Sequence, residues 1–387
     1  MKKRTRKLSY FLKEEKKRKN KKRRLAHCRR NNEPIIKTTY VRSTSTSKKI
    51  VKTVDKICKG HYLIKRSDIS KKVSGVASLS FPNELDFDTK PEDTNSFFVS
   101  LLSNAFALSK EVLPALLYLD FSNLARLSPE CALILIALFS KLTSYSPNTS
   151  INIKKDLSGM STRAYSVLKQ IGFWDYFKNS DITPPQGEES NKKIIRHTHS
   201  RQIIAKNIKT MLDEFEIDKE FGKERRNYIS RAILEAMNNV LDHAYLDEFT
   251  KKEKRNKKFL YDHWWMCCYK NKDETGFTFA IYDDGVGMPI TLKRKGLEFI
   301  TSPLSILKDT ELIVRAFKSG DRTRTEEEAR GNGLPTIIET VPKLDSILTV
   351  LSNSNYCRFE HNKTPVTKIF DKELSQLGTL LSWKVIP

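Results

Sequence analysis

The sequence predicts an α/β protein with two folded units, because two separate patterns of strands and helices follow one another along the chain. In the first half, the short apolar segments 115–121 and 151–153 are typical of buried strands. Helical patterns follow them, over 130–142 and 161–170. In the second half, a long amphipathic helix precedes a β-hairpin and two glycine-rich turns. A segment rich in proline, serine and acidic residues, Asp181 to Asn191, indicates a linker between the halves.

The composition is that of a folded, soluble chain. Of its 387 residues, 39% are hydrophobic and 10% aromatic, which is enough to form cores in both units. The longest apolar run, Cys131 to Phe139, is much shorter than the ~20 residues that cross a bilayer. The basic start is followed by further charge, so no signal peptide is predicted. The six cysteines lack metal-site or disulfide-framework spacing. We expect a cytoplasmic protein with reduced thiols and no contact with a membrane.

The formal net charge of +24 is concentrated at the amino end. Residues 1–30 contain 16 basic and two acidic residues, a net charge of +14. A block of this charge is expected to stay solvated, and nucleic acid is its strongest candidate partner because contacts to phosphates release counterions. Only Tyr10 and Phe11 interleave the block, so contacts to phosphates and not stacking on bases are expected. A solubilising tail is the alternative. Residues 1–60 are predicted to form a basic, flexible arm and linker.

The first folded unit is predicted to span residues 61–180. A strand near His61 to Lys65 begins it. Pro129 occupies the first turn of its long apolar helix, where a missing N–H has no cost. The helix over 161–170 is predicted to end at Gly172. The alternation of strand and helix predicts a small α/β domain.

Within this unit, the pattern LYLDFSNLARLSPECALILIALFSKL, followed by INIKKDL and VLKQIGFWDYF, resembles the STAS domain of anti-anti-sigma factors. In the regulatory members of that family, a phosphorylatable serine begins the helix and a glycine follows it. Glu130 and Cys131 stand at those two positions here. The resemblance therefore implies a STAS-like domain without a phosphoserine switch. We expect a packing module, and docking of a protein partner is the alternative role.

After the linker, placed at 181–193, the segment Arg226 to Tyr245 predicts an amphipathic helix. Glu235, Asn239 and His243 are spaced by four residues and form a polar stripe beside the apolar one. An amide oxygen is a hard metal ligand, and a carboxylate one turn earlier can orient a water molecule. A solvated helix face is the alternative. The apolar stripe consists of Ile229, Ala232, Ile233, Ala236, Met237, Val240, Leu241 and Ala244.

Two glycine-rich segments follow. The strands WWMCCY and GFTFAIYD predict a hairpin, and the second strand runs into the turn DDGVGMP, which begins with Asp283. Gly285 and Gly287 permit a close approach of the backbone to a flat or anionic group. Further on, Gly331 and Gly333 precede an apolar helix whose amino end is suited to phosphate. Each motif alone is also a common turn or helix start.

These elements occur in a specific order. ILEAMNNVLDHAY, IYDDGVGMP, GNGLP and the closing segment GTLLSWKVIP resemble the N box, the two glycine boxes and the last strand of GHKL ATPase domains. This family includes gyrase, histidine kinases and anti-sigma-factor kinases, and the N box is nearest to the anti-sigma-factor branch. The resemblance covers residues 194–387. It implies a two-layer α/β sandwich, the Bergerat fold, which binds ATP and Mg²⁺.

The resemblance also implies roles for individual residues. Asp283 would accept a hydrogen bond from the adenine amino group, which guanine lacks at that ring position, and Asn239 would coordinate Mg²⁺ at the phosphates. Glu235 would be catalytic and polarise the attacking nucleophile. The remaining implied ATP-binding residues are Gly285, Gly287 and Met288 in the first glycine box, Gly331, Gly333 and Leu334 in the second, the supporting Thr379, and the lid residues Arg324 and Arg330.

Three functions are consistent with these motifs. The first is a slowly hydrolysing ATP switch whose nucleotide state controls engagement of a partner or of nucleic acid, and Glu235 favours it because pure sensing needs no such residue. The second is an anti-sigma-type serine/threonine kinase, which would act on a separate protein because Glu130 replaces the acceptor serine. The third is a nucleic-acid-binding adaptor that only senses ATP. A homodimer is consistent with the resemblance as well.

Overall fold

The computed structural model describes residues 75–108, 115–144, 151–176, 192–200, 205–244, 264–271, 276–292, 308–318, 333–370 and 378–386. The basic arm, the strand predicted near His61 to Lys65 and the segment Asp181 to Asn191 lie outside these ranges. The described part is a mixed α/β protein. None of the helices described is long and apolar enough to span a membrane.

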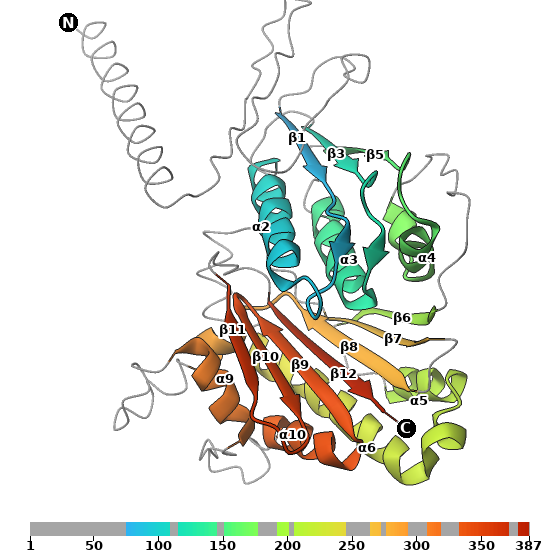
Figure 1. Ribbon diagram of the computed structural model, residues 1–387, viewed down its shortest axis with the longest axis vertical. Coiled ribbons are helices and arrows are strands. Elements are labelled where there is room, and N and C mark those ends of the chain that lie inside the picture. The colour runs from blue at the N-terminus through green and yellow to red at the C-terminus, as the bar shows by residue number, and fades with distance from the viewer. Residues whose placement is uncertain are drawn as a thin grey trace, which may run out of the picture.

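The small unit, within residues 75–176, contains a three-stranded parallel sheet with helices on one face (Figure 1). The strands predicted at 115–121 and 151–153 and the helices predicted at 130–142 and 161–170 are confirmed, whereas β1 and α2 were not predicted. Ser161 caps α4 by accepting from the Ala164 N–H at 3.1 Å. The strands are β1 (Gly75–Ser80), β3 (Ala115–Asp120) and β5 (Ile151–Asp156), with β2 (Glu84–Leu85) and β4 (Arg126–Leu127) as a separate pair; the helices are α2 (Pro91–Leu108), α3 (Pro129–Ser144), α4 (Thr162–Gln170) and the 3₁₀ turn η2 (Phe173–Tyr176).

The large unit, within residues 192–386, contains a seven-stranded antiparallel sheet in the order β11-β10-β9-β12-β8-β7-β6. The predicted hairpin and closing strand are confirmed, and β6 begins inside the linker predicted to reach residue 193. The strands are β6 (Lys192–Ser200), β7 (Trp264–Asn271), β8 (Phe277–Asp283), β9 (Ser346–Ser352), β10 (Asn355–Glu360), β11 (Val366–Ile369) and β12 (Thr379–Val385). The helices are α5 (Ala205–Glu214), α6 (Ile217–Asn239), the π-helical turn η3 (Val240–Ala244), α9 (Asp309–Lys318) and α10 (Gly333–Lys343).

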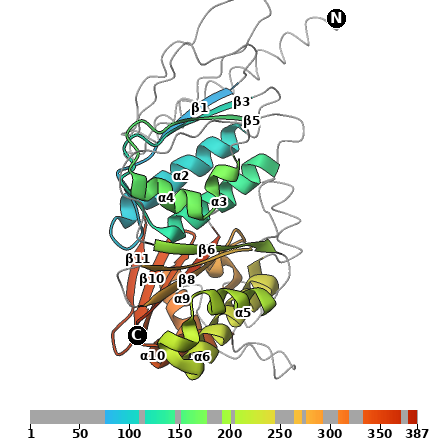
Figure 2. The ribbon, with the colours of Figure 1, turned by 90° about the vertical axis from the view of Figure 1, so that its right-hand side faces the viewer.

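The two units stack as four layers: small sheet, helices, large sheet, helices (Figure 2). One continuous apolar core includes residues of the small unit and of the near face of the large sheet, and a second core lies between the large sheet and its own helices. Residues 131–140 of α3 are all buried, because this helix lies between two sheets. A helix in that position is apolar around its whole circumference, which explains the run Cys131 to Phe139.

Polar contacts join the units at the edge of the shared core. Glu130 Oε1 accepts from the Tyr269 hydroxyl at 2.5 Å and from the Ser382 hydroxyl at 3.0 Å. Burial and the neighbouring Glu130 carboxylate raise the pKa of Tyr269, so its proton stays available for donation. The Tyr356 hydroxyl donates to Asp88 at 3.0 Å. Glu130 therefore has a structural role in holding the small unit on the large sheet.

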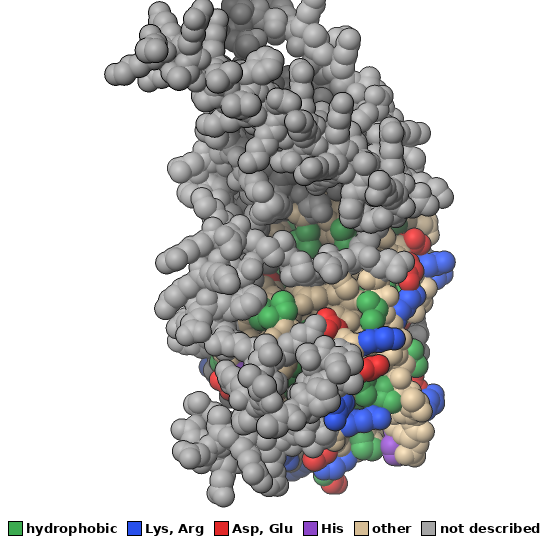
Figure 3. Space-filling model, turned by 90° about the vertical axis from the view of Figure 1, so that its left-hand side faces the viewer, with side chains coloured by type: hydrophobic (Ala, Val, Ile, Leu, Met, Phe, Trp, Pro, Cys, Tyr) green, Lys and Arg blue, Asp and Glu red, His purple; other side chains and the backbone are tan. Residues whose placement is uncertain are grey.

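The outer edge of the large sheet is β11, a strand of only four residues. Val366 and Ile369 are 59% and 50% exposed, whereas Lys368 forms an ion pair with Glu92 of α2 at 2.8 Å. Shortness and a lysine both disfavour pairing with further strands at an edge. On the described part of this side of the molecule, Lys and Arg side chains are interspersed with acidic and apolar ones (Figure 3).

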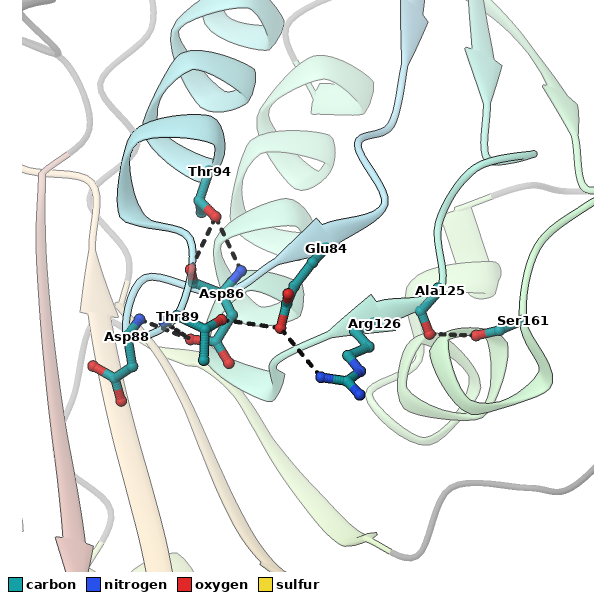
Figure 4. A network of polar contacts seen from close by, with 8 residues as sticks. All are labelled: Glu84, Asp86, Asp88, Thr89, Thr94, Ala125, Arg126 and Ser161. Carbon is teal, nitrogen blue, oxygen red and sulfur yellow. Dashed lines mark hydrogen bonds and ion pairs between the residues drawn. The ribbon is translucent and has the colours of Figure 1, made fainter.

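The turn before α2 contains a half-buried carboxylate, Asp86, close to the interface between the units. Its Oδ1 accepts from the main-chain N–H groups of Asp88 at 2.7 Å and of Thr89 at 3.4 Å. Its own N–H donates to the Thr94 hydroxyl at 3.0 Å (Figure 4). Burial is the main cause that raises the pKa of Asp86 to about 6, and the negative charges of Glu130 and Asp88 add to it. At neutral pH the ionised form of Asp86 therefore destabilises the fold.

We predict that Asp86→Asn stabilises the protein at pH 7.5, because the amide oxygen keeps both accepted hydrogen bonds and carries no charge. A carboxyl whose pKa is raised in the folded state contributes stability at low pH and loses that contribution as the pH rises through about 6. Relative to wild type, the gain of the variant should therefore develop between pH 4 and 7 and reach about 1–3 kcal/mol. Urea unfolding at several pH values measures it. Asp93→Asn, at an exposed acid in the first turn of the following helix α2, is the control, and a less stable Asp86→Asn protein at pH 7.5 would contradict the assignment.

Candidate functional site

A row of polar residues crosses the large sheet where three neighbouring strands end or begin. Thr379 at the start of β12 lies directly opposite Asp283 of β8 on one side and Ser352 of β9 on the other. Residues directly opposite one another in antiparallel strands direct their side chains to the same face. Trp264 continues the row on β7 and belongs to the second core. The row therefore faces the helices of the large unit.

Asp283 is the acidic member of this row. Its side chain is almost fully buried, and its Oδ1 accepts from the Gly285 N–H at 2.8 Å. The following residue, Asp284, is fully buried as well. On the opposite face of β8, burial and then the charges of Asp284 and Asp283 raise the pKa of the Tyr282 hydroxyl. Two adjacent carboxylates thus lie at the end of a buried strand, where a ligand could use an acceptor.

The glycines of the first glycine box are needed for packing within the protein. A Cβ atom at Gly285 would lie 2.5 Å from the carbonyl oxygen of Ala244, and that oxygen accepts from the Val286 N–H at 3.2 Å. Gly287 has a positive φ of 86°, and a Cβ atom there would lie 2.3 Å from the side-chain nitrogen of Asn353. The side of each glycine on which a Cβ atom would lie therefore contacts Ala244 or Asn353. The approach of these glycines to a ligand stays a prediction.

The amphipathic helix is confirmed, but its last turn differs from the prediction. The α-helix ends at Asn239 and continues as the π-helical turn Val240–Ala244. Leu241, predicted to be buried, is 39% exposed, because the wider turn changes the angular position of the residues that follow it. The same turn places the Ala244 carbonyl against the first glycine box. The other seven residues of the predicted apolar stripe are buried.

Glu235 and Asn239 are half-buried on the stripe beside the apolar one. The amide of Asn239 lies against the start of α10: a Cβ atom at Gly333 would be 2.8 Å from Asn239 Oδ1. Asn239 Nδ2 is buried and has no hydrogen-bond partner among the described residues. The helix predicted after the second glycine box is confirmed and begins at Gly333. Leu334, also assigned to ATP, packs partly buried against the second core.

The structure therefore brings many of the predicted site residues to one end of the large sheet. Met288 joins them through its N–H, which donates to the Ser352 hydroxyl at 2.8 Å. Arg324, Arg330 and Gly331 lie outside the described residues. No group of three or more His, Cys, Asp or Glu side chains that could hold a metal ion occurs in the described ranges. A metal ion here would need ligand oxygens from a bound anion in addition to Asn239.

The buried segment SNSN, where β9 turns into β10, was not predicted from the sequence to lie beside the first glycine box. All four of its residues, Ser352 to Asn355, are buried, with exposures between 0% and 8%. Polar turns of this composition normally lie at the surface, so the sequence alone favours an exposed hairpin. No signal in the sequence indicates its contact with the first glycine box, because that contact joins segments about 65 positions apart.

Comparisons of the chain with protein-family models, with curated proteins and with solved structures found no match.

We predict that Gly285→Ala destabilises the protein by about 2–4 kcal/mol, because the added methyl group meets the backbone of Ala244, which cannot move aside cheaply. Gly222→Ala is the matched control. Gly222, unlike Gly285, has a positive φ of 79°, but nothing lies within 4 Å of its added Cβ atom, so only backbone strain of about 1 kcal/mol is expected. Urea unfolding compares the two, and equal losses would show that the contact with Ala244 is not tight.

Proposed function

We propose that the chain binds ATP with Mg²⁺ at the end of the large sheet and works as a GHKL-type switch that hydrolyses ATP slowly. The observation that carries this proposal is a set of contacts that joins the motifs. Thr379 lies directly opposite Asp283, and Gly285 of the first glycine box lies against Ala244. Asn239, earlier in the same helical segment as Ala244, lies against Gly333 of the second glycine box. The motifs lie far apart in the sequence. If their resemblance to the family were a coincidence, there would be no reason for them to lie together in the fold. A seven-stranded antiparallel sheet with helices on one face also supports the Bergerat fold for this unit.

The buried Asp283 suits an adenine base. A carboxylate has about four acceptor positions, and the bond from Gly285 uses one of them. The exocyclic amino group of adenine would donate to another. Guanine has a carbonyl oxygen at that ring position, which the carboxylate would repel. Burial strengthens both effects, because water cannot replace either partner.

The contact between Asn239 and Gly333 suits a magnesium-bound phosphate chain. The side-chain oxygen of Asn239 would hold the ion, and water and phosphate oxygens would complete its shell. The amino end of α10 begins at this contact, and the N–H groups of Gly333 and Leu334 would bind phosphate there. Bound Mg²⁺ would neutralise part of the negative charge of the phosphates. Gly331 of the second glycine box and the lid residues Arg324 and Arg330 are proposed to complete the phosphate site.

Glu235 lies one helical turn before Asn239 and is half-buried. From that position it would accept a proton from the attacking water molecule, which makes hydrolysis the favoured reaction. Transfer to a serine of a separate protein is the alternative. Transfer within the chain to the helix start of the STAS-like unit is disfavoured, because Glu130 occupies that position and its Oε1 accepts from Tyr269 and Ser382.

We also propose that residues 1–30 bind nucleic acid through their net charge of +14. On the described part of the side that Figure 3 shows, basic side chains are interspersed with acidic and apolar ones. The helices of the STAS-like unit already pack on the large sheet. A protein partner of this unit would therefore use one of its other surfaces, and the same holds for a second copy of the chain.

We predict that Asp283→Asn weakens ATP binding at least 30-fold, because one orientation of the amide presents a donor to the adenine amino group and the charge is lost. Isothermal titration calorimetry with MgATP measures the dissociation constant. Asp242→Asn, at an exposed acid after α6, should bind ATP like wild type. Equal affinity of Asp283→Asn and wild type would show that the base does not bind at Asp283.

We predict that Glu235→Gln lowers the rate of ATP hydrolysis at least 100-fold and changes ATP affinity less than threefold, since it removes a general base and keeps the shape of the side chain. A phosphate-release assay and calorimetry measure the two quantities. Glu224→Gln, at an exposed glutamate of the same helix, is the control. If hydrolysis persists in Glu235→Gln, this residue has no part in the reaction, and a large loss of affinity would instead make it part of the binding site.

A further inference from the structure

The buried turn between β9 and β10 adds a second layer to the proposed base site. Ser352 is fully buried and is the cross-strand neighbour of Thr379, which in turn is the neighbour of Asp283. Asn355 extends the row by one more strand, and its side-chain amide donates to the Ser352 carbonyl oxygen at 3.3 Å. The four residues of this row, Asp283, Thr379, Ser352 and Asn355, are therefore all buried, and each is the cross-strand neighbour of the next.

Ser352 is the centre of a small hydrogen-bond network. Its hydroxyl oxygen lies 2.8 Å from the Met288 nitrogen, 3.1 Å from the Thr379 hydroxyl and 3.4 Å from the Gly378 carbonyl oxygen. The Met288 N–H can only donate, so Ser352 accepts there. Its single proton then goes to Thr379 or to Gly378, and the shorter distance favours Thr379. In that arrangement, Thr379 accepts from Ser352 and must direct its own proton elsewhere.

The adjoining Asn353 fixes the turn on which Met288 depends. Its side-chain nitrogen donates to the Val286 carbonyl oxygen at 3.2 Å, and its main-chain N–H donates to Gly378 at 3.1 Å. The residue has a positive φ of 54° and is 7% exposed. Its Oδ1 is buried without a partner among the described residues. Burial of this oxygen without a partner costs free energy. The two hydrogen bonds that Asn353 donates fix the position of the β9–β10 turn relative to the first glycine box.

We propose that Ser352 is a positioning residue of the base site, which orients the Thr379 hydroxyl as a donor. This inference rests on the proposed ATP binding. Asp283 then presents an acceptor and Thr379 a donor, side by side. Adenine offers the complementary pair, an amino donor at position 6 and an acceptor nitrogen at position 1. A 6-oxopurine offers the reverse, an acceptor oxygen and an N–H donor. Ser352 therefore sets the preference for adenine nucleotides over 6-oxopurine nucleotides.

The test compares ATP with inosine triphosphate, which differs from it only in this edge of the base. Calorimetry on the full chain gives both dissociation constants in the presence of Mg²⁺. In Ser352→Ala, Thr379 loses the hydroxyl that donates to it, so it can rotate and accept a hydrogen bond from the base. The preference for ATP over inosine triphosphate, measured as the ratio of the two dissociation constants, should therefore fall about tenfold. Ser354→Ala, a buried serine of the same turn, should keep the wild-type ratio. A purely structural role of Ser352 would weaken both nucleotides equally.

Thr379→Val provides a second route if Ser352→Ala does not fold. It removes the hydroxyl and keeps the volume, and we expect the same loss of preference. An unchanged ratio in Ser352→Ala or in Thr379→Val would overturn the inference and leave ATP binding intact. If the wild-type chain binds neither triphosphate, the proposed function fails and the inference fails with it.

Discussion

The burial of the central strands of the seven-stranded sheet on both faces is the constraint on which the rest of the structure depends. Most of its strands must be apolar on two sides, and β8 is buried at all of its residues. Polar groups inside such a sandwich are stable only where a partner meets them. Glu130 illustrates the requirement. Its Oε1 accepts from Tyr269 and Ser382, on two different strands, and breaking that contact would leave a buried acid without its donors.

The same constraint limits where polar side chains can lie. Thr278 and Ser382 are buried polar residues within β8 and β12. Asp283 and Thr379 lie directly opposite one another, at the end of β8 and the start of β12. At that level the sheet borders loops and helix ends, which have N–H groups to offer. The row from Ser352 to Asp283 is buried and therefore rigid, while its neighbours are the glycine boxes. In the proposed function, this rigid row of polar groups next to tight turns would bind the flat, polar base.

Periodicity predicted the elements that are buried on a regular face, and it failed where the surroundings decide. The apolar run of α3 and the apolar stripe of α6 could be recognised as helices from the sequence, because each pattern repeats over several turns. Strand β6 contains several charged and histidine residues, and β11 is largely exposed, so neither shows the pattern of a buried strand. Leu241 fits the α-helical stripe, but the π-helical turn places it outside. The contacts of Ser352 and Asn353 depend on strand register across the sheet, which a single sequence does not contain.

On β8 and β12, consecutive side chains point to opposite faces of the sheet and pack in different layers. This alternation connects the small unit to the polar row. Tyr282 and Leu380 lie in the core shared with the small unit, whereas the next residue on β8 and the preceding one on β12, Asp283 and Thr379, face the helices. The small unit thus packs directly behind the polar row. Since protein interiors are close-packed, displacement of the small unit would change the strand positions that set the spacing between Asp283 and Thr379. The geometry of the row is therefore a property of the whole four-layered structure and not of the large unit alone.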